Sequence, residues 1–343
     1  MTDSPFSIAG ESVAPGERRT VNIPVSVLAN HTPVNLAVHV VHGARPGPVM
    51  FMSGVVHGDE IIGLEVVRRL VRHAALGDIA GTLLAIPVVN AFGFIGQSRY
   101  LPDRRDLNRS FPGSDRGSLA SQLADLFMRE IVARAHFGID IHSAALHRSN
   151  LAQIRIAPGD AALMALAQAF APPVILVSKL REGSLRQSAR DRGVPVLLFE
   201  GGEALRFDEQ VIRTAVQGSL RVMREKGMIA GTGIEAARAS PPVSHASSWL
   251  RAPDGGILRS QHGTGDRVAA GETIGEISDP LGLRSEPVIA AEDGMIIGRT
   301  NLPVVHRGDA LFHIARIKDA RAAPARIGDE FADVPVLDED EII

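Results

Sequence analysis

The chain has 343 residues, of which 45% are hydrophobic and 22% are charged, and its formal net charge is −3. This length and composition are typical of a globular protein with two domains, or with one large domain and an appendage. A slightly negative charge provides no general attraction for nucleic acid or for an anionic membrane, so we expect neither as a partner. The absence of cysteine excludes disulfides and thiolate metal sites, and any transition metal must therefore be held by His, Asp or Glu.

The N-terminal segment and the apolar runs bear on location. The segment MTDSPFSIAGESVAPGERR lacks the basic start and apolar core of a signal peptide. No uninterrupted apolar run reaches the roughly 18 to 20 residues that are needed to span a bilayer. Together with the lack of cysteine, these features predict a cytoplasmic protein that does not insert into a membrane.

Short β-rich runs alternate with helical patterns between about residues 20 and 230. Strands are predicted at 48–56, 81–89, 137–142, 173–177 and 194–200. Helices are predicted at 60–73, 118–135, 159–170, 184–192 and 207–227, and a long loop at about 90–117. This alternation predicts an α/β fold with a doubly wound, mostly parallel sheet, in which ligands bind at the C-terminal ends of the strands.

The C-terminal part of the chain has a different pattern. After a Gly, Ala, Pro and Ser-rich stretch that is typical of a linker, the segments 252–277 and 290–314 repeat one pattern of short apolar alternations. A twofold repeat of short strands predicts a small all-β sandwich. The last residues contain eight acids against two arginines, which indicates a solvated tail. The predicted limits are 1–235 for the α/β domain, 236–248 for the linker, 249–318 for the sandwich and 319–343 for the acidic tail.

The stretch SGVVHGDEIIGLEVV, residues 53–67, places His57 three residues before Glu60 at a predicted strand-to-helix turn. The composition alone predicts about 0.6 such pairs by chance, so the spacing does not decide their role. A zinc hydrolase site takes about three protein ligands and keeps one position open for water, and His142 at the end of another strand supplies the third. The alternative is a turn histidine, a helix-start acid and a buried, hydrogen-bonded histidine. The role of Asp59, between the first two, stays open.

Two further acids lie near predicted strand ends. Glu200 ends the apolar run 194–200, where a carboxylate suits the base that takes a proton from water and passes it to a leaving nitrogen. The alternative for Glu200 is a buried acid that pairs with an arginine. Asp140 is expected on the face of its strand opposite His142, as a structural acid or as a partner that orients a ligand, rather than as a ligand itself.

Arginines are concentrated in the loop QSRYLPDRRDLNRSFPGSD, residues 97–115. Guanidinium groups suit the planar recognition of a carboxylate, and Asn108 beside Arg109 is placed to bind the second oxygen of such a group. The other arginines of this loop are Arg99, Arg104 and Arg105. A loop with this charge is equally compatible with a solvated surface, so this feature alone does not define a site.

Four motifs in this order, GVVHGDE, DLNRSFPG, DIHS and FEGGE, resemble the succinylglutamate desuccinylase/aspartoacylase family of zinc carboxypeptidase-like hydrolases. The resemblance extends over about residues 20–320. It implies a zinc carboxypeptidase-like fold and one Zn²⁺ per chain, bound by His57, Glu60 and His142. It also assigns Glu200 as general base and acid.

The resemblance also implies how the substrate is held. It places the Asn108-Arg109 pair on a substrate carboxylate, and an arginine a few residues before that pair on the scissile carbonyl. Arg99 is our choice for this arginine, with Arg104 and Arg105 as alternatives. The run SAALHRSNLAQIR, residues 143–155, departs from the best-known members of the family. Its candidate specificity residues are His147, Arg148, Asn150 and Arg155.

The C-terminal repeat resembles a lipoyl/biotinyl-like sandwich. Such domains carry their group on a lysine in the hairpin between the halves, but no lysine occurs between Lys226 and Lys318, which excludes a carrier role. The family resemblance implies that an appended β-domain can narrow the mouth of the zinc cleft, which would favour small substrates over proteins.

These expectations combine into one leading function, the zinc-dependent hydrolysis of the amide bond of a small N-acyl amino acid. Zinc is the expected cofactor, and a small molecule is the expected partner. The oligomeric state stays open, and a homo-oligomer is one of the alternatives. One alternative is a zinc carboxypeptidase that acts on short peptides. Another is a non-catalytic, metal-containing protein that binds a ligand.

Overall fold

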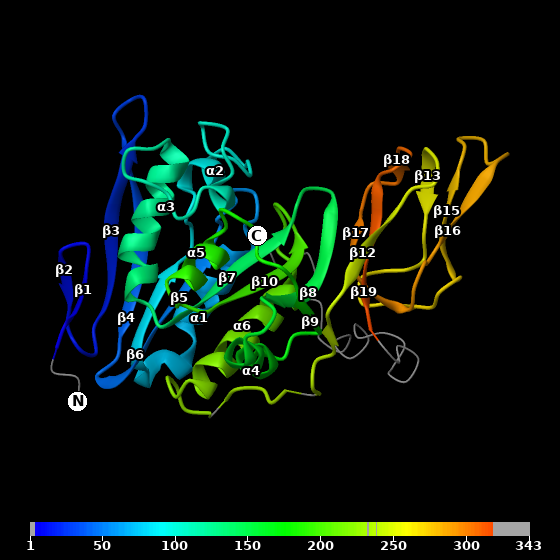
Figure 1. Ribbon diagram of the computed structural model, residues 1–343. Coiled ribbons are helices and arrows are strands. Elements are labelled where there is room, and N and C mark those ends of the chain that lie inside the picture. Colours follow the sequence, from blue (N-terminus) through cyan, green and yellow to red (C-terminus); the bar gives the residue numbers. More distant parts are fainter. Residues whose placement is uncertain (1–3, 232, 238, 318–343) are drawn as a thin grey trace, which may run out of the picture. The chain divides into compact units, whose positions relative to one another are not determined.

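The computed structural model describes residues 4–231, 233–237 and 239–317. The chain divides into two compact units, Met1–Ala246 and Ser247–Ile343 (Figure 1). The predicted limits of the domains and the linker remain predictions, and the predicted acidic tail at 319–343 lies outside the described residues. Among the described residues, no helix has both the length and the apolar character needed to cross a membrane.

A large mixed sheet forms the centre of the first unit. Its strands are β3 (Arg18–Val27), β4 (Pro33–His42), β5 (Arg45–Gly54), β6 (Ala80–Ile86), β7 (Phe137–Ala144), β8 (Arg148–Ile156), β9 (Val174–Val177), β10 (Val196–Glu203) and β11 (Val243–Ser244). Neighbouring strands follow the order β11-β9-β8-β10-β7-β5-β6-β4-β3. Pairing is parallel from β10 through β7 and β5 to β6, and also between β8, β9 and β11. The prediction of an α/β fold with a mostly parallel sheet is therefore confirmed.

Helices cover both faces of this sheet. One apolar cluster joins α1 (Ile62–Arg72), α4 (Ala161–Phe170) and α6 (Glu209–Glu225) to one face, and α4 and α6 lie side by side in Figure 1. A second cluster joins α3 (Leu119–Glu130) and α5 (Leu185–Asp191) to the other face. The remaining elements are β1 (Phe6–Ile8), β2 (Glu11–Val13), α2 (Ala91–Ile95) and the 3-10 turns η1 (Ala74–Asp78), η2 (Leu107–Arg109) and η3 (Val132–Arg134).

The two faces of the central strands have different neighbours. On β10, Leu197 and Phe199 belong to the cluster under α6, whereas Val196 belongs to the cluster under α5. On β7, Ile139 and Ile141 also face the α6 side. Because side chains alternate along a strand, the polar residues that lie between these apolar ones face the α5 side. The candidate site is built on that side.

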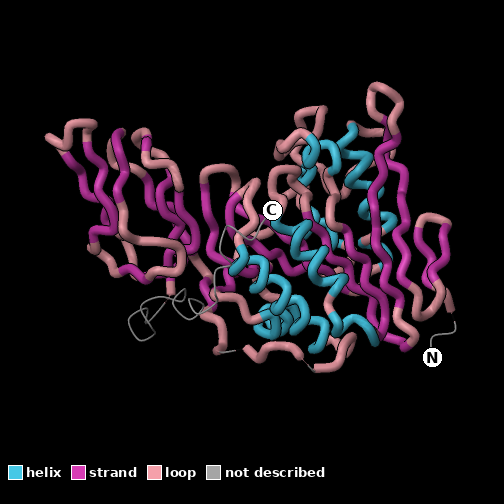
Figure 2. The backbone as a smooth tube through the Cα atoms, turned by 180° about the vertical axis from the view of Figure 1, so that it is seen from behind, coloured by secondary structure: helices cyan, strands magenta, loops and turns pink. Residues whose placement is uncertain are grey.

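The described part of the second unit consists of strands and loops (Figure 2). Its strands are β12 (Ser247–Arg251), β13 (Gly256–Arg259), β14 (Arg267–Val268), β15 (Thr273–Ser278), β16 (Ser285–Ile289), β17 (Gly294–Thr300), β18 (Val304–Val305) and β19 (Ala310–Arg316). They pair antiparallel in the orders β12-β19-β17-β14 and β16-β15-β13-β18. Their shared core includes Leu258, Ile274, Ile296 and Phe312. The prediction of an all-β C-terminal region is confirmed, and its likeness to a lipoyl domain remains a prediction.

Six strands of the first unit lie outside the predicted ranges, namely β1, β2, β3, β4, β8 and β11, and of these β8 bears on the candidate site. β8 reads RSNLAQIRI, and its polar residues obscure the apolar alternation that marks the other strands. It nevertheless pairs with β10 on one side and with β9 on the other. This strand carries Asn150 and Arg155, and its place beside β10 determines what these two side chains contact.

Candidate active site

Three predicted metal ligands meet at the C-terminal edge of the sheet. His57 and Glu60 lie in the turn between β5 and α1, and His142 lies on β7, which pairs with β5. All three are buried, and their candidate ligand atoms lie within 4.8 Å of one another. Nδ1 of His57 is 2.7 Å from one oxygen of the Glu60 carboxylate, and Nδ1 of His142 is 2.7 Å from the other. The two rings therefore face the same carboxylate from two sides.

The turn that carries the first two ligands is tightly packed. Val55 has a φ of 56°, and a Cβ built on Gly58 would lie 1.9 Å from the carbonyl carbon of Gly93 at α2. Glycine is therefore required between His57 and Asp59. Asp59 itself is buried, and its backbone carbonyl accepts a hydrogen bond of 2.8 Å from the backbone N–H of Leu205.

A carboxylate also lies beside the outer nitrogen of each ring. Nε2 of His57 is 3.1 Å from Oδ1 of Asp106, and Nε2 of His142 is 2.8 Å from Oδ2 of Asp140. When Nε2 donates its proton to a carboxylate, the lone pair of Nδ1 is available to bind a cation, which is the usual arrangement behind metal-bound histidines. Two imidazoles that are oriented in this way, together with the Glu60 carboxylate, fit the donor set of a zinc site.

The prediction for Asp140 was wrong in one respect. Residues two apart on a strand point to the same face, so Asp140 lies on the same face as His142 and not on the opposite one. Its second oxygen accepts a hydrogen bond of 2.7 Å from the Ser53 hydroxyl. Asp140 therefore orients His142, which agrees with its expected role as a partner of a ligand.

The charges in this group are strongly coupled. Burial alone would raise the pKa of Glu60, but the two histidines outweigh burial and lower it. Burial opposes protonation of His142, but Asp140 and Glu60 outweigh burial and hold its pKa well above the usual value. The buried carboxylates thus attract positive charge to this point. A divalent cation bound by neutral imidazoles would supply that charge.

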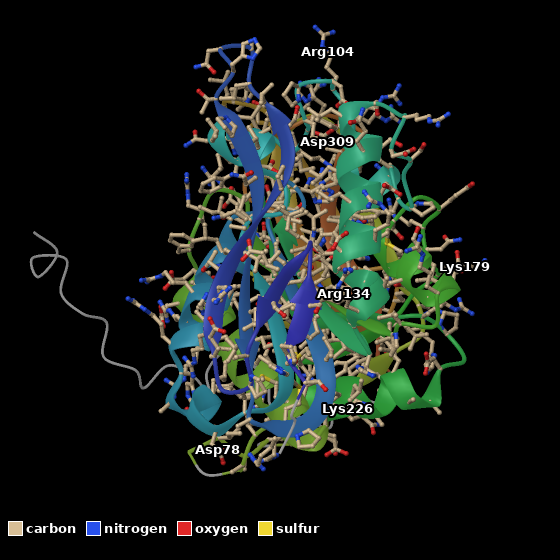
Figure 3. The ribbon with its side chains drawn as sticks, turned by 90° about the vertical axis from the view of Figure 1, so that its left-hand side faces the viewer. Asp78, Arg104, Arg134, Lys179, Lys226 and Asp309 are labelled. Atoms are coloured by element: carbon tan, nitrogen blue, oxygen red, sulfur yellow. The ribbon has the colours of Figure 1, made fainter. Side chains whose placement is uncertain are left out.

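Arg99 is the arginine of the loop that reaches these ligands. Its Nη1 donates a hydrogen bond of 3.1 Å to Glu60, and its Nε and Nη2 donate to Oδ2 of Asp106 at 3.1 and 2.9 Å. Arg104 and Arg105 are exposed, and the side chain of Arg104 extends away from the ribbon in Figure 3. Of the three alternatives for the scissile carbonyl, only Arg99 lies at the ligand group.

Asp106 was not among the predicted site residues. It contacts His57 across 49 residues of sequence, and it also accepts a hydrogen bond of 2.8 Å from the backbone N–H of Asn108. Asp106 is the first residue of the DLNRSFPG motif. Its place in that motif is the signal that could have identified it from the sequence. Asp106 therefore links the loop, the ligand turn and Arg99.

The Asn108-Arg109 pair lies on η2, in a loop that is fixed to the start of α5. Oδ1 of Asn108 accepts a hydrogen bond of 2.9 Å from the backbone N–H of Leu185, and the backbone N–H of Phe111 donates to the carbonyl of Gly183 at 3.0 Å. Burial, together with the charges of Arg181 and Arg99, lowers the pKa of Arg109. The loop thus places an arginine near other arginines.

Glu200 lies directly beside His142, because the two residues are register partners on β10 and β7. Its Oε2 accepts a hydrogen bond of 3.0 Å from Nδ2 of Asn150, and its Oε1 lies 3.3 Å from Nη1 of Arg155. Arg155, which was predicted to bind substrate, is therefore paired with the predicted base in this structure. Arg148, at the start of β8, is half-buried.

Arg186 on α5 was missed by the sequence analysis. It is 8% exposed, and its Nη1 has no hydrogen-bond partner among the described residues. Burial and the charge of Arg155 lower its pKa to about 10, although Glu200 and Asp140 oppose that shift. In sequence it is one of several arginines of a helix and looks like a solvated residue. Only the packing of α5 on the sheet reveals that it is buried beside the site.

The comparisons with known proteins agree with this geometry. The catalytic-domain model of the succinylglutamate desuccinylase/aspartoacylase family matches residues 46–226. The chain belongs to this family. The resemblance inferred from the four motifs is thus confirmed, and the family is one of deacylases.

Individual relatives cover most of the chain. The N-alpha-acetyl-L-2,4-diaminobutyric acid deacetylase of Halomonas elongata is 28% identical over 304 residues, which are 80% of this chain and 84% of that protein. The structure of a succinylglutamate desuccinylase/aspartoacylase from Rhodobacter sphaeroides is 25% identical, with a TM-score of 0.76, and the match covers 88% of this chain and 95% of that one. The product-bound structure of the ectoine utilization protein EutE (DoeB) from Ruegeria pomeroyi shares the fold at 21% identity, with a TM-score of 0.78 and coverage of 91% and 98%.

Proposed function

We propose that this protein is a zinc-dependent deacylase that hydrolyses the amide bond of a small N-acyl amino acid. The observation that carries the proposal is the group of His57, Glu60 and His142, in which a carboxylate lies beside the outer nitrogen of each imidazole. Glu200 stands next to His142 as the base. The deacetylase of Halomonas elongata acts on an N-acetylated amino acid, which supports this substrate class.

His57, Glu60 and His142 are the residues that would hold the ion. Zinc bound there would polarise the scissile carbonyl and lower the pKa of a water molecule towards about 7. Asp106 and Asp140 keep the two rings in the orientation that binding requires. All three ligand side chains are buried, so bulk water has little access to their ligand atoms.

The proton and the developing charge are handled by side chains of this chain. Glu200 takes a proton from the attacking water and gives it to the nitrogen as the C–N bond breaks, so that a carboxylate and an amine leave. Arg99 is fixed by Glu60 and Asp106, with its guanidinium beside the ligand group. It is placed to donate hydrogen bonds to the carbonyl oxygen as negative charge builds on it.

The substrate carboxylate is assigned to the arginines on the α5 side. Arg109 and the Nδ2 donors of Asn108 form a pair that suits a carboxylate, and Oδ1 of Asn108 is already held by Leu185. Arg186 adds a buried guanidinium whose Nη1 has no partner among the described residues. A bound anion would compensate the positive charge that these side chains share.

The test combines metal analysis with a panel of N-acyl amino acids and Glu200→Gln. The exchange removes the base and keeps the shape of the side chain, so kcat should fall by roughly 10² to 10⁴ while zinc stays bound. The matched control is Glu203→Gln, three residues further on, which should retain normal turnover.

Four results would contradict the proposal. The first is a fully active protein without zinc, and the second is a Glu200→Gln variant with normal kcat. The third is a preference for peptides longer than about three residues, which would indicate a carboxypeptidase. Tight binding of N-acyl amino acids without any turnover would instead indicate a non-catalytic protein.

A further inference from the structure

The carboxylate of Glu200 is held at both of its oxygens by side chains of one strand. Nδ2 of Asn150 donates a hydrogen bond of 3.0 Å to Oε2, and Nη1 of Arg155 lies 3.3 Å from Oε1. Both partners come from β8, the antiparallel neighbour of β10. The side chains of Glu200 and Arg155 are only 15% and 22% exposed, so water competes weakly for this contact.

An irregularity in the pairing of β8 with β10 explains how Asn150 reaches Glu200. Glu200 is opposite Gln153 and Leu198 is opposite Arg155, but Gly202 is opposite Asn150. Two steps along β10 thus correspond to three steps along β8, so β8 contains one extra residue. In a regular strand Asn150 would face away from Gln153, and the extra residue turns it to the same face. β-bulges commonly redirect a side chain in this way beside a site.

We infer that Asn150 and Arg155 are positioning residues that fix the orientation of the Glu200 carboxylate. This inference rests on the proposed function, in which Glu200 accepts a proton from water and returns it to the leaving nitrogen. Proton transfer requires an oxygen of the base within about 2.6 to 3.2 Å of the proton's heavy atom. Hydrogen bonds to both oxygens fix the orientation of the carboxylate plane, whereas a carboxylate without these partners can rotate about its terminal C–C bond.

The charged neighbours of Glu200 support this role. His142 lies beside it on β7, Arg155 contacts it from β8, and the buried Arg186 of α5 attracts it. Arg155 is the one arginine for which the structure has an ion pair with Glu200 among the described residues. If Arg155 instead bound a substrate carboxylate through its other N–H groups, its removal would weaken substrate binding and raise KM. The positioning role and the predicted substrate role of Arg155 therefore give different kinetics.

The kinetic experiment uses Asn150→Ala, Arg155→Met and Arg155→Lys in the full chain loaded with zinc. A misplaced base slows the chemical step, so kcat should fall roughly ten- to a hundred-fold in the first two variants, with KM within about twofold of the original value. Arg155→Lys keeps a cation near Oε1 and should recover part of kcat. Arg190→Met, which removes an exposed arginine of α5, is the matched control and should leave both constants unchanged. A rise in KM with kcat preserved would show that Arg155 binds substrate and would overturn the inference.

A second measurement does not depend on turnover. The melting temperatures of Arg155→Met, Glu200→Gln and the double variant form a cycle, and contact between the two side chains predicts a shift in the double variant that is smaller than the sum of the single shifts. If no N-acyl amino acid is hydrolysed but this coupling is present, the proposed function fails and the contact stands. If hydrolysis is normal but both the coupling and the loss of kcat are missing, the positioning role fails alone.

Discussion

The two sides of the candidate active site are organised in different ways. On the metal side, both nitrogens of His57 and of His142 lie beside carboxylate oxygens, so the protein orients every ring itself. On the arginine side, Arg186 is buried with an Nη1 that has no partner among the described residues, and Arg109 is near other cations. The metal side is therefore preorganised by internal hydrogen bonds, whereas the arginine side has an excess of positive charge that suits an anionic ligand.

The largest effect is expected from the metal side. Glu60→Gln replaces the carboxylate between the two rings by an amide, which removes a charged ligand and the attraction for a cation. We expect the purified variant to contain little zinc and to lose nearly all activity. For the unchanged protein, a chelator should abolish turnover and added zinc should restore it, whereas added zinc should not rescue Glu60→Gln. Metal content by mass spectrometry and activity measure both, and a zinc-loaded, active variant would contradict the assignment.

A smaller effect is expected from the acids behind the histidines. Asp140→Asn keeps the size of the side chain but removes the negative charge that holds Nε2–H of His142, so zinc affinity should fall by roughly ten- to a hundred-fold. Asp106→Asn should have a similar effect through His57 and should also slow turnover, because Asp106 holds Arg99. Competition with a chromogenic chelator measures the affinity. Unchanged affinity in both variants would mean that the protein does not preorganise the rings as described.

The smallest effect on activity is expected on the arginine side. There the loss of a side chain should not lower the stability of the free protein. Arg186→Met removes a buried charge whose Nη1 has no partner among the described residues, and with it two long hydrogen bonds from Nη2, 3.5 Å to the Ser178 hydroxyl and 3.4 Å to the Lys179 carbonyl. Because these bonds are long and the unpartnered buried donor is costly, the melting temperature of the free protein should stay constant or rise. The KM for N-acyl amino acids should increase about tenfold with little change in kcat, because an anion partner is lost. Thermal unfolding and steady-state kinetics provide both values. A clear drop in melting temperature with an unchanged KM would make Arg186 a structural residue.

The sequence was most informative where chemistry is concentrated in short motifs. His57, Glu60, His142 and Glu200 were proposed from strand ends, and the parallel sheet does bring these ends together. Residues whose role depends on distant contacts were harder to predict. Asp106 contacts His57 across 49 residues, and no local pattern indicates that α5, which carries Arg186, packs on the face of the sheet that carries Glu200.

Two errors that concern the candidate site came from the strands themselves. The face of Asp140 was assigned wrongly although the twofold period of a strand settles it. β8 was missed because its polar residues interrupt the apolar pattern, and its bulge, which redirects Asn150, leaves no trace in the local sequence. The partners of Glu200 therefore became visible only in the folded chain.

The contact between Gly58 and Gly93 has a consequence for how the site could change. A Cβ on Gly58 would overlap the backbone at Gly93, and a Cβ on Gly93 would lie 2.7 Å from the carbonyl oxygen of Ser98, which precedes Arg99. There is less than the width of a methyl group between the ligand turn and the loop that supplies Arg99. An alanine at either glycine would therefore have to push these segments apart, which would shift Arg99 relative to Glu60. In an evolving or designed variant, both glycines would have to be kept.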